Sequence, residues 1–414
     1  MDARRTLLRS LFDAAVQAAM PANCMSDWLP ARPAGEVVII GAGKAAASMA
    51  VELERHWQAP LQGAVIVPHG HGVPCHCVDV LEASHPLPDE TSVAATRALL
   101  ERVGGLTADH TVVCLLSGGG SSLLAQPLAG VSLAGKHRIA AELLRCGAPI
   151  HEINAVRKKL SAIKGGKLAL ACAPARVITL IISDVPGNDP AVVASGPTLP
   201  DPASADDALS ILSRYEITVS SAVLEAMRAG DLPATRRIES DVHILATNDD
   251  ALQAAATQAI EAGITPYILG DLRGDARELA AEHARLALDI AAMHGPLTPP
   301  AVILSGGEAT VRVSGQGRGG RNGEYLLELA LALNGHPAVS ALACDTDGID
   351  GSGDNAGAFI GPGTLQRATA QSIDARALQA CNDSYRLFAA TSDLIVTGPT
   401  HTNVNDFRAV LIDA

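Results

Sequence analysis

The chain has 414 residues, of which 48% are apolar and only 2% aromatic, and it carries a formal net charge of −13. Two domains with aliphatic cores are expected at this length, and helices layered on parallel strands suit such residues. The acidic charge argues against a nucleic-acid-binding protein, which would show a basic face, although an acidic protein can still bind small anions through helix N-termini and single cationic side chains.

The N-terminal segment and the cysteines bear on the cellular setting. Residues 1–20 have the pattern of an amphipathic helix with mixed charges and lack the apolar region of a signal peptide. No run approaches the ~18 apolar residues of a membrane span, and the eight cysteines lack disulfide-framework spacing. We therefore expect a cytoplasmic protein with no membrane or nucleic-acid partner; a homodimer is left open.

Short apolar runs alternate with helical patterns along almost the whole chain. Strands are predicted at residues 37–40, 64–67, 111–116 and 177–182, and then at 242–246, 266–269, 301–304, 310–313, 339–343 and 394–396. Helices fit between them, for example at 249–262 and 275–293. This alternation predicts two α/β/α sandwich domains with Rossmann-like doubly wound sheets, which we expect to face an interdomain cleft. Because residues 204–238 are helical and polar, we place the domains at 1–235 and 236–414.

The first glycine loop follows the first predicted strand. Gly41-Ala-Gly43-Lys44 leads into an Ala-rich helix and matches half of a dinucleotide fingerprint. The other half is missing, because the second strand ends in Pro-His-Gly instead of the carboxylate that would hold a ribose. Lys44 opposes the dipole of the helix it begins, so it favours a bound anion. A plain strand-to-helix turn remains the alternative.

A second glycine loop is the stronger phosphate-binding candidate. It follows an apolar strand, is predicted to open a helix, and consists of Ser117, Gly118, Gly119, Gly120, Ser121 and Ser122. Consecutive glycine amides and two hydroxyls can converge on a phosphate, although a structural turn is the other reading. A similar Ser-Gly-Gly turn is predicted in the second half, at Gly306 and Gly307. Residues 130–137 also approach a P-loop, but they end in His and no strand precedes them, so we reject that pattern.

Acidic side chains follow predicted strands in both halves. Asp184 and Asp189 lie on a Pro/Gly-braced loop, and Asp345 and Asp347 begin an acidic turn. Such carboxylates can hold Mg²⁺ or accept a hydroxyl proton, but Asp is also a good turn residue. The acidic turn lacks the Gly and the closing Glu of an EF-hand, so that reading is rejected.

Cationic and polar side chains complete the candidate site. Residues 314–324 carry five glycines and bring Arg318 and Arg321 to a helix start, where they can clamp a carboxylate or phosphoryl oxygen; a solvated linker is the alternative. The amides and hydroxyls of the loop with Thr400 and Asn403 could bind a sugar acid or a nucleotide, or the loop could be only a capped turn. The His and Cys residues at 69–77 match no zinc spacing.

These motifs together resemble the glycerate 2-kinases, whose C-terminal half is the MOFRL domain. The resemblance runs nearly end to end, through IGAGKAAASMA, EASHPLPDE, LLSGGGSS, INAVRKKLSAIKGGKLA, ISDVPGNDPAVVASGPT, LSGGEATVRV, GRGGRNGEYLLELAL, DTDGIDGSGDNAGA and TGPTHTNVND. It implies two α/β domains around a deep cleft, and transfer of the γ-phosphoryl group of ATP to the 2-hydroxyl of D-glycerate with Mg²⁺. It also implies that Lys44 is the family's invariant lysine, that Arg321 is its arginine, and that Asp184, Asp189, Asp345 and Asp347 are its acidic residues.

We therefore predict an ATP-dependent glycerate 2-kinase. The catalytic residues are predicted to be Lys44, Asp184, Asp189 and Arg321, with Asp189 as the first choice of proton acceptor. ATP phosphates are assigned to residues 117–122, with Gly306 and Gly307, and Mg²⁺ to the four aspartates. The expected substrate contacts are His85, Lys164, Arg318, Asn322, Thr400 and Asn403. An NAD(P)H-dependent hydroxypyruvate reductase and a non-catalytic sugar-acid sensor are the alternatives.

Overall fold

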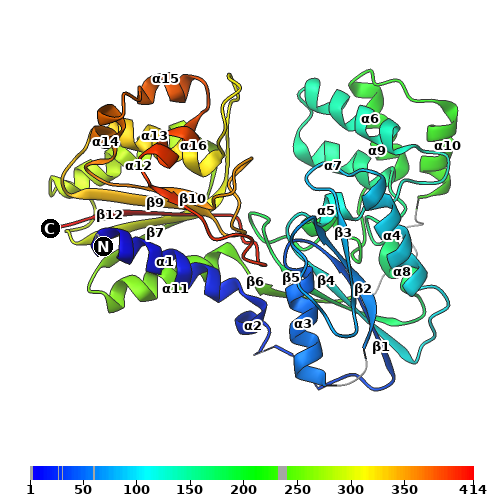
Figure 1. Ribbon diagram of the computed structural model, residues 1–414. Coiled ribbons are helices and arrows are strands. Elements are labelled where there is room, and N and C mark those ends of the chain that lie inside the picture. The colour runs from blue at the N-terminus through cyan, green and yellow to red at the C-terminus, as the bar shows by residue number, and fades with distance from the viewer. Residues whose placement is uncertain (1–2, 27, 30, 59–60, 232–239) are drawn as a thin grey trace. The chain divides into compact units, whose positions relative to one another are not determined.

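The structure, a computed structural model, describes residues 3–26, 28–29, 31–58, 61–231 and 240–414. It divides into two compact units (Figure 1). The inserted unit is Met25–Leu245, and the terminal unit combines Met1–Cys24 with Ala246–Ala414. This division differs from the predicted one, because the first helix belongs with the C-terminal part and the chain crosses at 245/246. The predicted boundary at residue 235 lies outside the described residues.

The inserted unit is built on a six-stranded sheet of order β3-β2-β1-β4-β5-β6. Its strands are β1 (Glu36–Ala42), β2 (Gln62–Pro68), β3 (Asp79–Ala83), β4 (His110–Leu116), β5 (Arg176–Ile182) and β6 (Asp241–Ala246). The registers of β1 with β2 and β4, of β2 with β3, and of β4 with β5 are all parallel. The strand order reverses between β1 and β4, which is where ligands bind in such sheets. The run at 242–246, predicted for the second domain, is β6 of this sheet.

Two groups of helices complete the inserted unit. Those that follow or flank the strands are α3 (Ala46–Trp57), α4 (Glu90–Arg102), α5 (Gly120–Leu123), α8 (Lys167–Cys172) and the 3₁₀ turn η1 (Val193–Ser195). The second group forms a helical layer: α6 (Leu133–Arg145), α7 (Ile150–Lys159), α9 (Ala205–Arg214) and α10 (Ser221–Ala229) (Figure 1). That layer has its own apolar core, which includes Leu143, Val156 and Met227.

The terminal unit is built on a second six-stranded sheet, of order β11-β10-β9-β12-β8-β7. Its strands are β7 (Thr265–Asp275), β8 (Ala301–Thr310), β9 (Val339–Asp345), β10 (Gly357–Ile360), β11 (Leu394–Ile395) and β12 (Asp406–Ile412). Strands β7 and β8 are parallel, whereas β12 runs antiparallel to both β8 and β9, and β10 runs antiparallel to β9 and β11. The prediction of two α/β domains is confirmed, but this sheet is mixed and not doubly wound throughout, because its last strand returns between two others.

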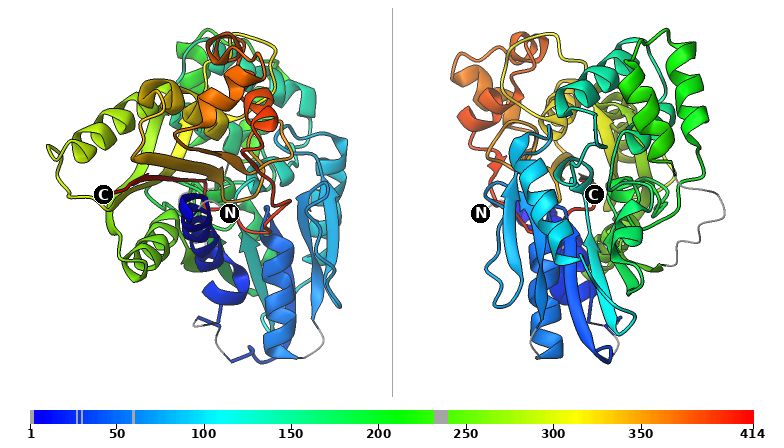
Figure 2. Two further views of the ribbon diagram at one scale, coloured as in Figure 1. Left: turned by 60° about the vertical axis from the view of Figure 1, so that its left-hand side comes forward. Right: turned by 90° about the vertical axis from the view of Figure 1, so that its right-hand side faces the viewer.

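Helices cover both faces of the terminal sheet. On one face, α1 (Ala3–Ala19) packs with α11 (Asn248–Glu261), and α2 (Pro21–Cys24) follows α1 (Figures 1 and 2). On the other face are α12 (Ala276–Ala291) and α13 (Arg321–Leu333), with the short helices α14 (Thr364–Ala370), α15 (Ala375–Ala380) and α16 (Ser384–Ala390). Helix α1 buries Leu8, Leu11 and Phe12, and the ring of Phe12 lies 6.0 Å from that of Phe407 in β12. This packing explains why α1 belongs to the terminal unit.

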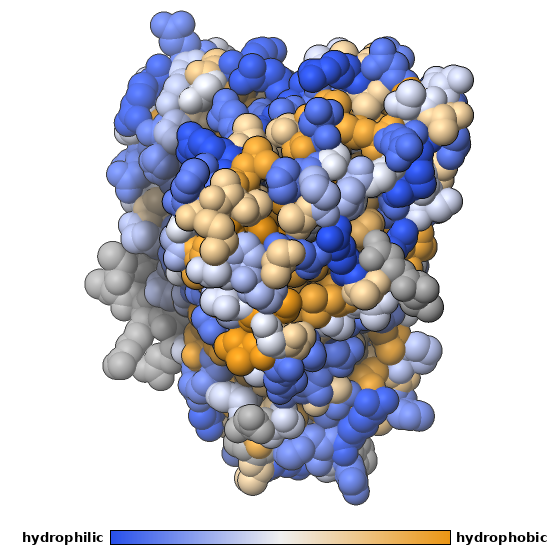
Figure 3. All heavy atoms as spheres, turned by 90° about the vertical axis from the view of Figure 1, so that its left-hand side faces the viewer, coloured by the Kyte–Doolittle hydropathy of each residue, from blue (hydrophilic) through white to orange (hydrophobic). Residues whose placement is uncertain are grey.

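The surface is mixed in character. Figure 3 shows apolar side chains among hydrophilic ones on one face of the molecule. No helix within the described ranges is long and apolar enough to cross a membrane. Large apolar side chains that are strongly exposed include Leu87, Leu144 and Ile150 of the inserted unit, and Ile260 of the terminal unit. The first three line a cavity described below.

Candidate active site

The two glycine loops of the inserted unit interlock at the point where the strand order reverses. Ala42 and Leu116, the last residues of β1 and β4, are register partners. The Ser117 amide donates to the Ala42 carbonyl at 3.2 Å, and the Lys44 amide donates to the Gly118 carbonyl at 2.9 Å. Gly43 has a φ of +139°, and a Cβ atom there would lie 2.2 Å from Ser117 Oγ. Glycine is therefore required at position 43 because the second loop packs directly against it.

The first loop cannot cradle a pyrophosphate as it stands. Its consecutive amides at Gly43, Lys44, Ala45 and Ala46 donate to Ile66 O, Gly118 O, Ser117 Oγ and Gly43 O. By contrast, the amides of Gly118 and Gly119 donate to no acceptor within the described part of the chain. Adjacent amides of this kind can form an anion-binding nest. The anion-binding capacity thus lies in the second loop, and the first loop holds it in place.

Lys44 and His85 flank the second loop at Gly119. This glycine has a φ of +83°, and a Cβ atom there would lie 2.9 Å from His85 Nε2 and 3.7 Å from Lys44 Cγ. The helix predicted to follow is only the four-residue turn α5, so its dipole contributes little. The structure therefore brings together Lys44, predicted to be catalytic, His85, predicted to contact substrate, and two open amides of the loop assigned to phosphate.

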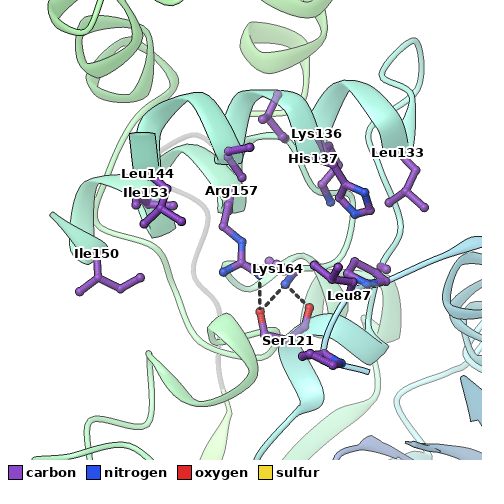
Figure 4. Close-up of a pocket in the computed structure, with 16 residues that line it drawn as sticks. Leu87, Ser121, Leu133, Lys136, His137, Leu144, Ile150, Ile153, Arg157 and Lys164 are labelled. Atoms are coloured by element: carbon purple, nitrogen blue, oxygen red, sulfur yellow. Dashed lines mark hydrogen bonds between the residues drawn. The ribbon is translucent and has the colours of Figure 1, made fainter. Parts of the chain in front are cut away.

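Ser121 links this loop to a group of cations. Its Oγ accepts from Lys164 Nζ at 2.6 Å and from Arg157 Nη2 at 3.3 Å, and it lies 2.8 Å from Ser195 Oγ. Lys164 also donates to the Ser121 carbonyl (Figure 4). The hydroxyl of Ser122, in contrast, donates back to the Gly119 carbonyl at 2.9 Å. The Ser121 hydroxyl therefore ties the glycine loop to Lys164 and Arg157, whereas Ser122 stabilises the turn.

A cavity of about 400 Å³ opens beside Ser121, between α6, α7 and the loop with Leu87. Three cationic side chains line it: Lys136 of α6, Arg157 of α7 and Lys164 (Figure 4). No carboxylate of the described residues lies within ion-pair distance of any of them. Burial, and then Arg157 and Lys167, lower the pKa of Lys136 from 10.5 to about 8. Burial, and then Arg157 and Lys136, lower the pKa of Lys164 well below its ordinary value. The cavity is therefore electropositive in an acidic protein, and a bound anion would stabilise its cations.

Sequence reasoning missed two of these cations. Lys136 was set aside with the rejected P-loop-like segment, and that rejection agrees with the structure, where Ser132 caps a helix and no strand precedes it. Arg157 was not singled out. The available signal was composition, since residues 157–167 contain five Lys or Arg in a chain of net charge −13. Two of the five are paired with two carboxylates, because Lys158 lies 3.7 Å from Asp201, and Lys159 lies 3.3 Å from Asp201 and 2.9 Å from Asp231.

The carboxylates of the inserted unit follow β5, which is the neighbour of β4. Asp184 lies two residues beyond β5 and is partly buried. Asp189 is exposed, and its Oδ1 accepts from the Ala191 amide at 2.9 Å, so it also braces its own turn. Within the described ranges no group of three or more His, Cys, Asp or Glu side chains could hold a metal ion. A metal here would depend on fewer protein ligands.

Arg321 is the centre of a charge cluster in the terminal unit. It donates to Asp406 Oδ1 at 2.7 Å, to Asp345 Oδ2 at 2.8 Å and to Glu308 Oε1 at 3.0 Å. Burial alone would lower its pKa, but Asp406 and Asp345 outweigh that effect and raise it. Asn322 joins the cluster by donating to Asp406 Oδ1 at 2.7 Å. At least three of the five N–H groups of Arg321 are used, so it is held rigidly and not as a solvated side chain.

Hydrogen bonds join the acidic loop of the terminal unit, which carries Asp345 and Asp347, to the loop with Thr400. Asp345 and Asp347 are buried; Asp345 Oδ1 accepts the Asp347 amide at 3.1 Å, and Asp347 Oδ1 accepts the Ile349 amide at 2.8 Å. The Thr400 amide donates to the Asp347 carbonyl at 3.0 Å. Asn403 is also buried and accepts the Asn405 amide at 3.1 Å. Much of the hydrogen-bonding capacity of this region therefore shapes the loops themselves.

Two predictions for the terminal unit are corrected by the local geometry. Gly306 and Gly307 do not form a turn after a strand, because both lie inside β8 and are in register with β7 and β12. A Cβ atom on Gly306 would lie 1.7 Å from Asn248 Oδ1, so this glycine serves close packing. Likewise, the strand expected at 310–313 is only the end of β8 at Thr310. Arg318 is exposed, and its guanidinium lies 3.7 Å from the ring centre of Tyr385 and donates to Asp354 at 3.2 Å.

Family models and known proteins match the chain across this architecture. Residues 7–228 match a domain of unknown function, DUF4147, and residues 301–406 match the MOFRL family. The D-glycerate 2-kinase of Thermotoga maritima is 37% identical over 400 residues, covering 96% of this chain and 95% of that protein. A protein of Agrobacterium vitis that carries the name of a hydroxypyruvate reductase is 48% identical, covering 99% of this chain and 94% of its own.

A solved structure agrees with these matches. The crystal structure of glycerate kinase from Thermotoga maritima superposes with a TM-score of 0.89 at 36% sequence identity, covering 100% of both chains. A two-domain α/β protein with a glycine-rich loop where the strand order reverses is the class that the fold and the site define. Within that class, the chain belongs to the glycerate 2-kinase family with DUF4147 and MOFRL domains.

Proposed function

We propose that this protein is an ATP-dependent glycerate 2-kinase, which transfers the γ-phosphoryl group of ATP to the 2-hydroxyl of D-glycerate. The observation that carries the proposal is the phosphate-binding arrangement where the strand order reverses. There the open amides of Gly118 and Gly119 lie beside Lys44, and Ser121 leads to Lys164. Similarity over almost the whole length to a D-glycerate 2-kinase supports the acceptor and the reaction.

The residues present suit phosphoryl transfer, which depends mainly on positioning and on stabilising charge. Lys44 and the two glycine amides would bind the transferring phosphoryl group. Asp189, exposed on the loop after β5, would accept the proton of the glycerate hydroxyl. Lys164 would bind a carboxylate or phosphate oxygen. Arg321, oriented by its three carboxylates, is the cation that we assign to catalysis in the terminal unit.

The carboxylates fit Mg²⁺ of the kind bound with a nucleotide. Such an ion is usually held by one or two carboxylates, with phosphate oxygens and water completing its shell. In the inserted unit Asp184 is the candidate, since it follows the strand next to the second glycine loop. In the terminal unit the candidates are Asp345 and Asp347, each of which accepts a backbone amide with one carboxylate oxygen. When bound, the ion would neutralise charge on the phosphates.

The direct test is incubation of the full chain with ATP, Mg²⁺ and D-glycerate, followed by NMR of the product. We expect phosphorus coupled to the C2 carbon of glycerate and stoichiometric ADP. A product phosphorylated at C3 would overturn the assignment of the acceptor hydroxyl. Binding of glycerate without any phosphorylated product would instead support a non-catalytic sensor.

A hydroxypyruvate reductase is the second candidate, because one relative carries that name. The structure disfavours it in two ways. The amides of the fingerprint loop are all used within the protein, and β2 is followed by His69 and Gly70, where a ribose-binding carboxylate would be needed. We expect no loss of NADH or NADPH absorbance with hydroxypyruvate, and a steady loss that needs no ATP would favour the reductase.

The proposal includes a cytoplasmic enzyme. All eight cysteines are free thiols in the structure, which suits a reducing compartment. Fractionation of the native host would test this location. Light scattering would decide whether the enzyme is the homodimer that the sequence left open.

A further inference from the structure

The cavity beside Ser121 has two chemically different parts. One part is cationic and is lined by Lys136, Arg157 and Lys164, of which Arg157 and Lys164 point toward Ser121 (Figure 4). Three aliphatic side chains gather to one side of Arg157, and we call them the apolar end: Leu144, Ile150 and Ile153 (Figure 4). A ligand that fills the cavity must therefore combine negative charge with an apolar surface.

Two side chains of the apolar end, Leu144 and Ile150, are exposed in a way that folding alone does not explain, whereas Ile153 is buried in the core of the helical layer. Leu144 is 70% exposed and Ile150 is 66% exposed, although the same two helices bury other large aliphatic side chains, such as Leu143 and Val156. Leu87, across the cavity, is 75% exposed. Exposed aliphatic side chains grouped around a cavity mark a binding surface more often than scattered ones do. Here they border the cationic part, which restricts the ligand further.

Charge and size argue against glycerate as the sole occupant. The three cations repel one another, and no carboxylate among the described residues pairs with them. The single carboxylate group of glycerate would not neutralise all three. A cavity of about 400 Å³ is in the range that holds drug-sized ligands, and a three-carbon acid would leave most of it empty. A polyphosphate with an apolar ring meets both requirements.

We propose that this cavity binds ATP, with the base against the apolar end and the α- and β-phosphates between Lys136, Arg157 and Lys164. This placement rests on the proposed kinase function, and it names the nucleotide subsite of that function. Ser121 connects the subsite to the Gly118–Gly119 amides and Lys44. The triphosphate would then run from the cavity toward Lys44, where the γ-phosphoryl group is transferred.

The test measures binding without turnover, by calorimetry on the full-length protein with ADP, with tripolyphosphate and with D-glycerate. The Leu144→Gln/Ile150→Gln double variant removes apolar contact but no charge. We expect it to raise the Kd for ADP about tenfold, as lost aliphatic contact of this size should, and to leave the Kd for tripolyphosphate within about twofold. Ile260→Gln, at a side chain 63% exposed in the terminal unit, is the matched control and should change neither.

A second pair of variants tests the cationic part. Lys136→Met should raise the Kd for both ADP and tripolyphosphate about tenfold or more, because it removes one charged contact to phosphate. Arg138→Met lies two residues away on the same helix and removes the same charge, but Arg138 pairs with Glu142 at 2.9 Å on the exposed side, so this variant should bind normally.

The outcomes separate this inference from the kinase proposal. If the double variant weakens glycerate binding and spares ADP, the cavity holds the acceptor acid and the inference is wrong while the kinase stands. If none of these variants changes the Kd for any of the three ligands, the nucleotide binds elsewhere and the inference is again wrong. If the unaltered protein forms no phosphoglycerate, the proposed function fails on its own measurement, and selective loss of ADP affinity would still support a nucleotide subsite.

Discussion

Replacing Lys136 with Met should stabilise the ligand-free protein. This lysine is partly exposed, yet burial and the nearby Arg157 and Lys167 lower its pKa from 10.5 to about 8. A shift of that size corresponds to roughly 3 kcal/mol at about 1.4 kcal/mol per pH unit. Because the partly exposed side chain is screened by solvent, we expect about 1–2 kcal/mol of added unfolding free energy near neutral pH. Met keeps the length of the apolar stem, so packing in α6 should change little.

The stability difference between the Lys136→Met variant and the unaltered protein should depend on pH in a defined direction. The folded-state pKa lies below the unfolded-state value, so between about pH 8 and 10.5 the unfolded chain binds more protons and the unaltered protein gains stability as pH rises. The variant lacks that gain, so its advantage should be largest below pH 8 and should shrink above it. Urea unfolding followed by tryptophan fluorescence is the assay, because both tryptophans, Trp28 and Trp57, lie in the inserted unit with Lys136.

Arg138→Met controls for the loss of a charge on α6 and should be neutral or slightly destabilising, since it breaks only a surface pair. A Lys136→Met protein that is less stable than the unaltered chain near neutral pH would refute the idea that the cavity holds unneutralised positive charge. The same result would remove the electrostatic basis of the proposed nucleotide subsite.

Two further predictions concern Arg321 and Gly119. Arg321→Ala should lose most turnover. It should also lower the unfolding free energy of the terminal unit by about 2 kcal/mol, because the fully buried Asp406 loses a charged partner. Amide hydrogen exchange of α13 would detect this loss of stability, and unchanged protection would contradict the prediction. Gly119→Ala should reduce kcat/KM about a hundredfold by pushing the His85 ring, which a Cβ atom would approach to 2.9 Å. Gly105→Ala is its control, with a similar φ of +77° and no atom within 4 Å of the new Cβ, and equal losses in both variants would show that backbone strain alone is responsible.

Some of the site could be read from local sequence. Lys44 and the loop at 117–122 were singled out because both follow apolar strands, and neighbouring parallel strands bring their ends to one edge of the sheet. Gly306 and Gly307 carry the same local pattern but lie within a strand. The sequence could not reveal this, because the close contact with Asn248 comes from a helix almost sixty residues earlier.

The cationic cavity depended on tertiary structure. Lys136 and Arg157 lie on two different helices, and each alone is an ordinary polar position of an amphipathic helix. They become a site only when α6 and α7 pack together above Ser121. The first helix shows the same limit: its apolar stripe predicts a buried face, but not that the face packs on β12 and α11 instead of the sheet that follows it in the chain.

The position of α1 has a consequence for how the protein is made. Domains generally fold as units while they emerge from the ribosome, so residues 25–245 can fold as soon as they are synthesised. Helix α1 is translated before them, but Leu8, Leu11 and Phe12 have no burial partner until α11 and β12 have followed. During most of translation the nascent chain therefore exposes the apolar face of α1 to solvent. A truncated product that ends near residue 245 would keep this face exposed and should be prone to aggregate.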